Sequence, residues 1–352
     1  MENDNQIQNE KIQLIEALVQ KSLEIIEQPR EQEIINRRFG LNGTKETLEQ
    51  IGERLDITRE RVRQLEKAAL IRLKIAAEKG EIEHLAEIEK ALIRNLAESG
   101  RISKTKNLVE KYLAKTPTEQ DISNLLFIAE ISSKLVVVQE NDKYFSAIAN
   151  AEYGDERKIK SAIDEIVNII KKNKSPMTLD ELDSKLSYEH PSQIEAIAGV
   201  SKNLASLNNL WGLEKWPSVN PKNIRDKIFV ILGAKKEPMH FSEIAKEIRE
   251  SDFSRKDVTT QAIHNELIKD KRFVLIGRGI YALDDWGFKK GTVADTITAV
   301  LEEAGEPLYR DEIVKRVLEK RKVKETTVLL NLQSKKEFVR VAKATYGLAK
   351  NI

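Results

Sequence analysis

The chain has 352 residues, of which 59 are lysine or arginine and 57 are aspartate or glutamate, so its formal net charge is +2. This length leaves room for several small domains, and the near balance of charge excludes a protein whose entire surface attracts polyanions. The absence of cysteine excludes disulfides, a thiolate nucleophile and a thiolate zinc site, and it fits a reducing compartment. No apolar run approaches the length of about 18–20 residues that spans a bilayer, and the first residues lack an apolar signal core. We therefore expect a cytoplasmic protein without a membrane partner.

Few side chains point to catalysis. The histidines do not stand at metal-ligand spacing; they are His84, His190, His240 and His264. No glycine-rich phosphate-binding motif is present, and residues 277–279 (Gly-Arg-Gly) lie between two β-type runs, where they predict a hairpin turn. We therefore expect a protein that is not an enzyme and has no metal, no cofactor and no small-molecule substrate.

The first predicted elements are an N-terminal helix within residues 1–28 and a pair of helices within residues 29–78. In this pair, Thr47 is a helix cap and Gln50 completes a capping box. Gly52 lies in the middle of the first helix, where glycine costs about 1 kcal/mol relative to alanine. A glycine there indicates that the backbone of another helix passes close by. Asp56 tolerates a turn conformation and is predicted to end the helix.

Thr58 is predicted to cap the second helix of this pair, which has two different faces. Its apolar residues share one narrow arc; they are Val62, Leu65, Ala69 and Leu73. The opposite arc carries the types of side chain that read base edges; they are Arg59, Glu60, Arg63 and Gln64. Residues 54–74 hold seven basic and three acidic side chains. This pattern predicts a helix-turn-helix that binds double-stranded DNA, and the alternative is a structural helix pair with a solvated charged face.

Residues 30–74 resemble region 4 of bacterial sigma factors of the primary type. The resemblance is carried by Arg30-Glu31, by the run RFGL at 38–41, by TLEQIG at 47–52 and by TRERVRQLE at 58–66. It implies that this segment reads the minus-35 promoter element and that its base contacts come from the outward arc of the second helix. The implied phosphate contacts are Thr58, Arg61, Arg54 and Lys67.

The same resemblance implies that RNA polymerase is a partner, through the flap of its beta subunit. The first half of the segment could supply an apolar surface for that contact, although ordinary core is the favoured interpretation for most of its residues; they are Ile34, Ile35, Phe39 and Leu41. An aromatic-rich region 2, which melts the minus-10 element in complete sigma factors, is not found in this sequence. We therefore expect that this chain alone does not melt a promoter.

Beyond the helix pair, residues 75–97 predict a continuation of the second helix, and a pattern then recurs. The similar segments are 175–182, 237–244 and 306–313. Each follows a helical run and precedes another, and each unit closes with a β-type ending that contains an aromatic residue; these aromatics are Trp211, Tyr281 and Tyr346. The order fits winged-helix domains over 151–220, 221–290 and 291–352, with a possible weaker copy over 79–150. The predicted fold is therefore mainly α: a sigma region 4 helix-turn-helix followed by tandem winged-helix domains, each of three helices plus a β-hairpin.

Residues 221–287 resemble the HARE-type helix-turn-helix domain, which occurs in the delta subunit of bacterial RNA polymerase. The resemblance is carried by Pro238 and by GRGIYALDDWG at 277–287, and it implies nucleic-acid or protein binding. Arg278 and Lys343 are candidate wing contacts to DNA, with solvated hairpin tips as the favoured alternative. The aromatics of the endings, together with Trp216 and Trp286, could stack on bases, but their regular recurrence favours closure of a core.

The leading hypothesis is a sequence-specific DNA-binding transcription protein that reads a minus-35-like element and associates with polymerase. One alternative is a polymerase-binding interaction protein without DNA specificity of its own. The other is a DNA-binding accessory of a restriction or defence system. None of the three is an enzyme.

Overall fold

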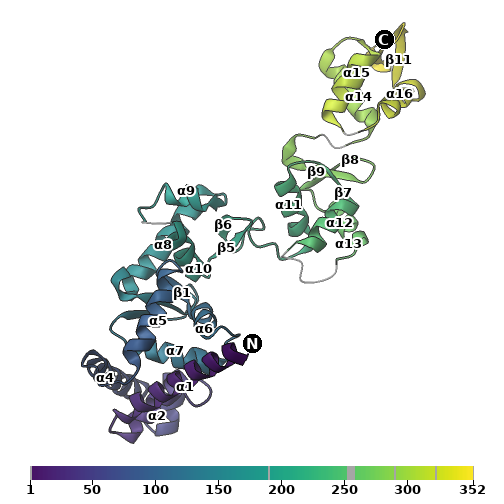
Figure 1. Ribbon diagram of the computed structural model, residues 1–352. Helices are drawn as coiled ribbons and strands as arrows, with labels where there is room; N and C mark the ends of the chain where they lie inside the picture. Colours follow the sequence, from purple (N-terminus) through teal and green to yellow (C-terminus); the bar gives the residue numbers. More distant parts are fainter. Residues whose placement is uncertain (1, 189–190, 252–257, 289–290, 322, 352) are drawn as a thin grey trace. The chain divides into compact units, whose positions relative to one another are not determined.

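The computed structural model describes residues 2–188, 191–251, 258–288, 291–321 and 323–351. The chain is mainly helical with small antiparallel sheets, as the sequence predicts (Figure 1). It divides into two compact units, Met1–Lys215 and Trp216–Ile352, called here the first and the second unit. Within the described ranges, no helix combines the length and the apolar character that crossing a membrane requires.

The first unit begins with four helices. They are α1 (Glu2–Glu24), α2 (Pro29–Phe39), α3 (Leu48–Leu55) and α4 (Arg59–Glu78). The capping box predicted for α3 is confirmed, because the Thr47 hydroxyl accepts from the backbone of Gln50 while the Gln50 side chain accepts from the backbone of Thr47. Asp56 ends α3 in a left-handed conformation with φ 53°, as expected for a short polar residue that forms a turn.

The expectation that α4 continues through residue 97 is wrong. The helix ends at Glu78, and α5 (Leu85–Ala97) is a separate helix. Gly80 adopts a φ of +74°, which glycine reaches without the steric cost that a Cβ atom imposes, and its backbone amide donates to the carbonyl of Ala77. The Lys79-Gly80 pair is therefore a helix stop that the hydrophobic spacing concealed.

From α5 onward, one order of elements occurs four times: helix, short strand, helix, helix and a two-stranded hairpin. Repeat A comprises α5, β1 (Ile102–Lys104), α6 (Thr105–Leu113), α7 (Glu119–Ile131), β2 (Leu135–Val138) and β3 (Ala147–Asn150). Repeat B comprises α8 (Glu156–Asn173), β4 (Met177–Thr178), α9 (Leu179–Asp183), α10 (Pro191–Val200), β5 (Leu204–Leu207) and β6 (Leu210–Leu213). Both belong to the first unit.

The second unit holds the other two repeats. Repeat C comprises α11 (Ile224–Lys235), β7 (Met239–His240), α12 (Phe241–Glu250), α13 (Thr260–Lys269), β8 (Phe273–Gly277) and β9 (Ile280–Leu283). Repeat D comprises α14 (Val293–Ala304), β10 (Leu308–Tyr309), α15 (Arg310–Lys320), α16 (Glu325–Ser334), β11 (Phe338–Ala342) and β12 (Thr345–Leu348). In every repeat the last strand lies between the first and the middle strand, and all pairings are antiparallel.

The aromatic endings lie in the central strands of their sheets. Trp211, Tyr281 and Tyr346 belong to β6, β9 and β12, and all are buried. Tyr281 and Tyr346 join the apolar cores of repeats C and D, respectively. The favoured interpretation, in which these rings close a core, is therefore confirmed for these three side chains.

The core of the first unit joins the helix pair to repeat A. Buried side chains of α1, of the second half of α4 and of α5, α6 and α7 form one cluster, with Phe127 of α7 among its largest members. The first half of α4 instead packs on α2 and α3 through Val62, Ile34 and Ile51. One helix thus belongs to two cores, so the predicted recognition helix is fixed to the rest of the first unit.

Candidate nucleic-acid interface

The turn between α3 and α4 is tight and depends on Gly52. The amide of Ile57 donates to the carbonyl of Gly52 at 3.0 Å. A Cβ atom on Gly52 would lie 2.7 Å from the carbonyl oxygen of Ile57. The close backbone expected at this glycine is therefore present: it comes from the turn that follows α3 and from Arg59, the first residue of α4, whose amide nitrogen would lie 3.4 Å from the Cβ atom.

We expect Gly52→Ala to lower the free energy of unfolding of the first unit by roughly 1 kcal/mol. Alanine in a helix is more favourable than glycine by about 1 kcal/mol, which would stabilise the variant. Overpacking of a close contact costs about 1–3 kcal/mol, and here the obstructing atom is backbone, which cannot rotate away. Urea unfolding monitored by circular dichroism measures the change.

Gly199→Ala is the matched control, because Gly199 also lies in a helix of the first unit but a Cβ atom there meets nothing within 4 Å. Gly199→Ala should leave the free energy of unfolding unchanged or raise it. Equal stability of the two variants would show that the turn does not constrain residue 52.

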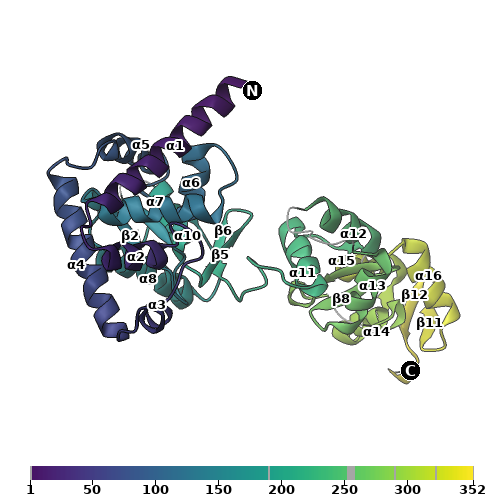
Figure 2. The same ribbon diagram turned by 90° about the horizontal axis from the view of Figure 1, so that it is seen from below.

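The outward face of α4 brings together the four predicted base-contact residues. All four side chains are exposed at the start of the helix; they are Arg59, Glu60, Arg63 and Gln64. The inward residue Val62 is fully buried. In both views α4 lies along an edge of the first unit (Figure 2). The face is thus solvent-accessible over its first two turns.

Three of these side chains are already hydrogen-bonded to one another. The Arg63 guanidinium donates to both carboxylate oxygens of Glu60, from Nε at 2.8 Å and from Nη2 at 2.6 Å. The amide nitrogen of Gln64 donates to Oε1 of Glu60 at 3.4 Å. Hydrogen bonding from Arg63 and its positive charge lower the pKa of Glu60, so the pair stays ionised at neutral pH. The i,i+3 spacing of Glu60 and Arg63 is the signal in the sequence that indicates this pair.

The predicted phosphate contacts differ in how free their side chains are. The Thr58 hydroxyl accepts from the backbone of Arg61 at 3.2 Å and so acts as the cap of α4. Arg61 and Lys67 are exposed and form no ion pair within the described residues. Arg54 is exposed, but its Nη2 lies 3.4 Å from Oε1 of Glu46. Arg61 and Lys67 are therefore the more available cations beside the outward face of α4.

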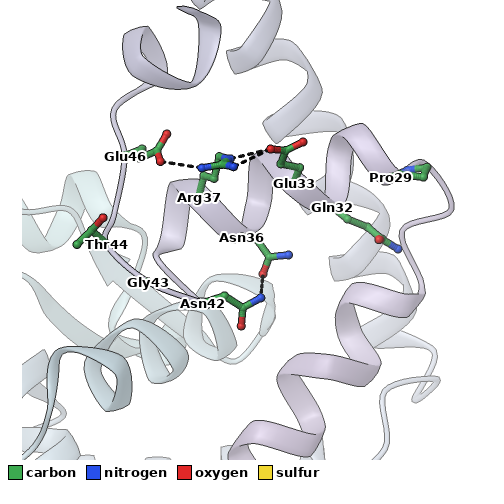
Figure 3. A pocket seen from close by; sticks show the side chains of 9 residues that line it. All are labelled: Pro29, Gln32, Glu33, Asn36, Arg37, Asn42, Gly43, Thr44 and Glu46. Carbon is green, nitrogen blue, oxygen red and sulfur yellow. Dashed lines mark hydrogen bonds and ion pairs between the residues drawn. The ribbon is translucent and has the colours of Figure 1, made fainter. Parts of the chain in front are cut away.

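Glu46 is the centre of a polar network beside α2 (Figure 3). Its Oε1 accepts from Nη1 of Arg37 at 2.9 Å, and Arg37 also donates from Nε to Glu33 at 2.8 Å. The hollow here has a volume of about 510 Å³ and is lined mainly by polar side chains. Oε2 of Glu46 is buried without a hydrogen-bond partner among the described residues. This carboxylate therefore holds Arg54 and Arg37 together next to the turn.

Three contacts of α2 hold the helix pair in place and were not foreseen from the sequence. The guanidinium of Arg30 donates to the carbonyl of Leu55 at the end of α3. Buried Glu31 forms an ion pair with Arg72 of α4. Nε of Arg38 lies 3.1 Å from Oε1 of Glu66, whose pKa burial raises while Arg38 opposes the rise. The resemblance had marked Arg30, Glu31 and Arg38 as motif residues without giving them a structural role.

The apolar residues suggested as a surface for the polymerase flap lie in the interior. Ile34, Ile35 and Leu41 are buried. Phe39 is partly buried, and its ring meets that of Phe127 edge-on, with centroids 5.3 Å apart. The favoured interpretation as ordinary core is therefore confirmed, and these side chains do not form an open docking surface.

The predicted wing contacts belong to two different repeats of the second unit. Arg278 lies in the turn between β8 and β9, and Lys343 lies between β11 and β12, where both are exposed. The hairpin turn predicted at 277–279 is thus confirmed. His190 lies outside the described residues. In the part of the chain that the structure covers, no group of three or more His, Asp or Glu side chains is arranged to hold a metal ion.

Residues 28–74 match the family model described as "Sigma-70, region 4". A segment of the chain is 43% identical over 61 residues to the RNA polymerase sigma factor RpoD of Neisseria gonorrhoeae, covering 16% of this chain and 10% of that protein. Sigma factor SigA4 of Synechococcus elongatus is 46% identical over 50 residues, or 14% and 16% of the two chains. Sigma factor SigA of Clostridium acetobutylicum is 47% identical over 47 residues, or 13% and 12%. The predicted resemblance of this segment is confirmed, and the match spans less than a fifth of each relative.

Proposed function

We propose that this chain is a DNA-binding transcription protein that reads a minus-35-like promoter element through α3 and α4. The observation that carries the proposal is the exposed face of α4. Its first two turns, which directly follow the tight turn after α3, carry Arg59, Glu60, Arg63 and Gln64. These side chains suit guanine, cytosine and adenine edges in the major groove. The sigma factors that resemble this segment support a role at promoters.

The proposal includes association with bacterial RNA polymerase in the cytoplasm, supported by the same relatives. It also includes the absence of catalysis and of promoter melting by this chain alone. For the four repeats, we propose the winged-helix fold, since their order of elements and their sheet order agree with three helices closed by a hairpin. The HARE-type resemblance of residues 221–287 stays a prediction.

The alternative of a polymerase-binding protein without DNA specificity would need a partner surface on the region 4 segment. The burial of Ile34, Ile35 and Leu41 removes the apolar surface first suggested for that role. The exposed base-reading face of α4 has no function in that alternative. We therefore favour DNA reading by α4.

Selection of bound fragments from random duplexes, with and without polymerase, tests the proposal. The full chain should enrich one sequence motif without polymerase, and the affinity for that motif should fall steeply with salt because phosphate contacts release counterions. Enrichment only in the presence of polymerase would favour the interaction protein. No enrichment in either arm would contradict promoter reading.

A further inference from the structure

The third helix of each repeat has a different environment in the two units. In repeat A, α7 is packed against α1, α2 and α4. In repeat B, α10 is packed against β1, and the φ +76° residue Gly100 lies so near Ser192 that a Cβ atom there would be 2.5 Å from the Ser192 carbonyl oxygen. Both third helices therefore take part in the packing of the first unit.

In repeat D, by contrast, α16 presents an open face. At about 100° per residue its outward residues fall within one arc centred on Leu330; they are Thr326, Thr327, Leu330, Gln333 and Ser334, all of which are exposed. Leu330 is 64% exposed, while the opposite face buries Val328 and Leu332 in the core of the repeat. No carboxylate lies on this outward arc.

Positive charge in the second unit is concentrated around this helix. Residues 321–352 hold eight lysines or arginines and only two carboxylates, whereas residues 216–320 hold 19 basic and 18 acidic side chains. Lysines precede and follow α16, and the hairpin of β11 and β12 adds two further cations. The exposed cations are Lys324, Lys335, Lys336, Arg340 and Lys343.

Asp295 lies close enough to Lys335 for their charges to attract, but no carboxylate of the described residues makes direct contact with these cations. Within the described ranges none of them forms an ion pair, whereas Lys320 and Lys350 of the same repeat pair with Glu303 and Glu302. Lys324 also provides no side-chain cap at the start of α16. An uncapped helix start with unpaired lysines is complementary to phosphate.

We propose that α16 and the β11–β12 hairpin form a second surface for double-stranded DNA, separate from α4. The cations contact phosphates on either side of the neutral helix face, and Leu330 with the threonines faces the groove between them. The surface adds affinity without a base-specific arginine or carboxylate on the helix. Two DNA contacts on one chain raise the effective concentration of the first contact once the second is made.

This inference deepens the proposed function, since α4 would supply the sequence preference and repeat D the sequence-independent affinity. The test compares two triple variants of the full chain on a random-sequence duplex across a salt series. The first is K335Q/K336Q/K343Q. The matched control is K236Q/K246Q/K269Q, which removes three exposed lysines of repeat C.

We expect the first variant to bind more weakly and to flatten the slope of log affinity against log salt by about two to three, since each lost phosphate contact removes about 0.9. The control variant should retain the parental slope. Equal slopes for the two variants would overturn the proposal. Unchanged DNA binding combined with loss of polymerase capture by the first variant would also overturn it, in favour of an acidic protein partner.

The two proposals fail in different ways. If α4 is not the reader, Arg63→Ala leaves the sequence preference unchanged while K335Q/K336Q/K343Q still flattens the salt slope. If repeat D does not touch DNA, the sequence preference still depends on Arg63 and the slope does not change. Thermal melting of both triple variants should match the parent, because all six lysines are exposed.

Discussion

Arg63→Ala weakens binding of the full chain to its selected duplex by roughly ten- to a hundredfold, the range expected when one bidentate contact to a base is removed. Gln64→Ala has an effect of similar size at a neighbouring base pair. In the free protein Arg63 is bound to Glu60, but exposed ion pairs of this kind contribute little, so a base edge can displace the carboxylate. Fluorescence anisotropy with the selected site and with single-base variants measures both the affinity and the preference.

The matched control is Arg157→Ala, which removes one exposed arginine from α8 of the same unit. Arg157→Ala should reduce the affinity for the selected duplex only slightly, as expected when a positive charge far from the contact is removed. Arg63→Ala should also relax the preference at one base pair, whereas the control should not. Equal affinity and equal preference of the Arg63 variant and the parent would show that α4 does not read the site.

Phe127→Ala should lower the free energy of unfolding of the first unit by about 3–5 kcal/mol, the cost typical of a fully buried ring. This is a large share of the 5–15 kcal/mol that stabilises an ordinary domain. Because Phe127 meets Phe39 of α2 edge-on, the loss should spread from repeat A to the helix pair and abolish site-specific binding. Urea unfolding followed with the binding assay measures both effects.

Phe145→Ala is the control, because Phe145 belongs to the same repeat but is 37% exposed. Phe145→Ala should lower the free energy of unfolding far less than Phe127→Ala does. The account of one shared core would be wrong if Phe127→Ala unfolded repeat A and left binding to the selected duplex intact.

Local signals in the sequence predicted the helix pair well. The capping residues Thr47 and Thr58 and the turn residue Asp56 each act through bonds to their own neighbours, so their role can be inferred without knowing the fold. The outward arc of α4 follows from helical periodicity alone. The stop after Glu78 depends on a local signal too, the positive φ of Gly80, but the hydrophobic spacing around it is typical of a continuous helix and conceals the stop.

Contacts between distant segments could not be predicted in this way. The edge-on contact of Phe39 with Phe127 joins positions far apart in the chain, and nothing near either residue indicates the partner. The same holds for buried Glu31 and Arg72, and for the covering of α7 by α1. The charge of residues 321–352 was visible in the sequence, but its meaning depended on the exposed face of α16 beside it, which only the fold reveals.

The chain contains no cysteine, so a single introduced thiol gives one defined cross-linking position. The most direct test of the central claim uses Gln64→Cys and a duplex with the selected site whose major-groove base edge carries a tether ending in a mixed disulfide, so that attack by the cysteine thiolate forms the cross-link and releases the small thiol. Glu78→Cys is the control; it lies on the same helix about 21 Å further along the axis, at 1.5 Å per residue. We expect rapid disulfide formation from position 64 and none from position 78. Efficient binding without a cross-link from position 64, or equal cross-linking from both positions, would contradict the claim that the start of α4 lies in the major groove.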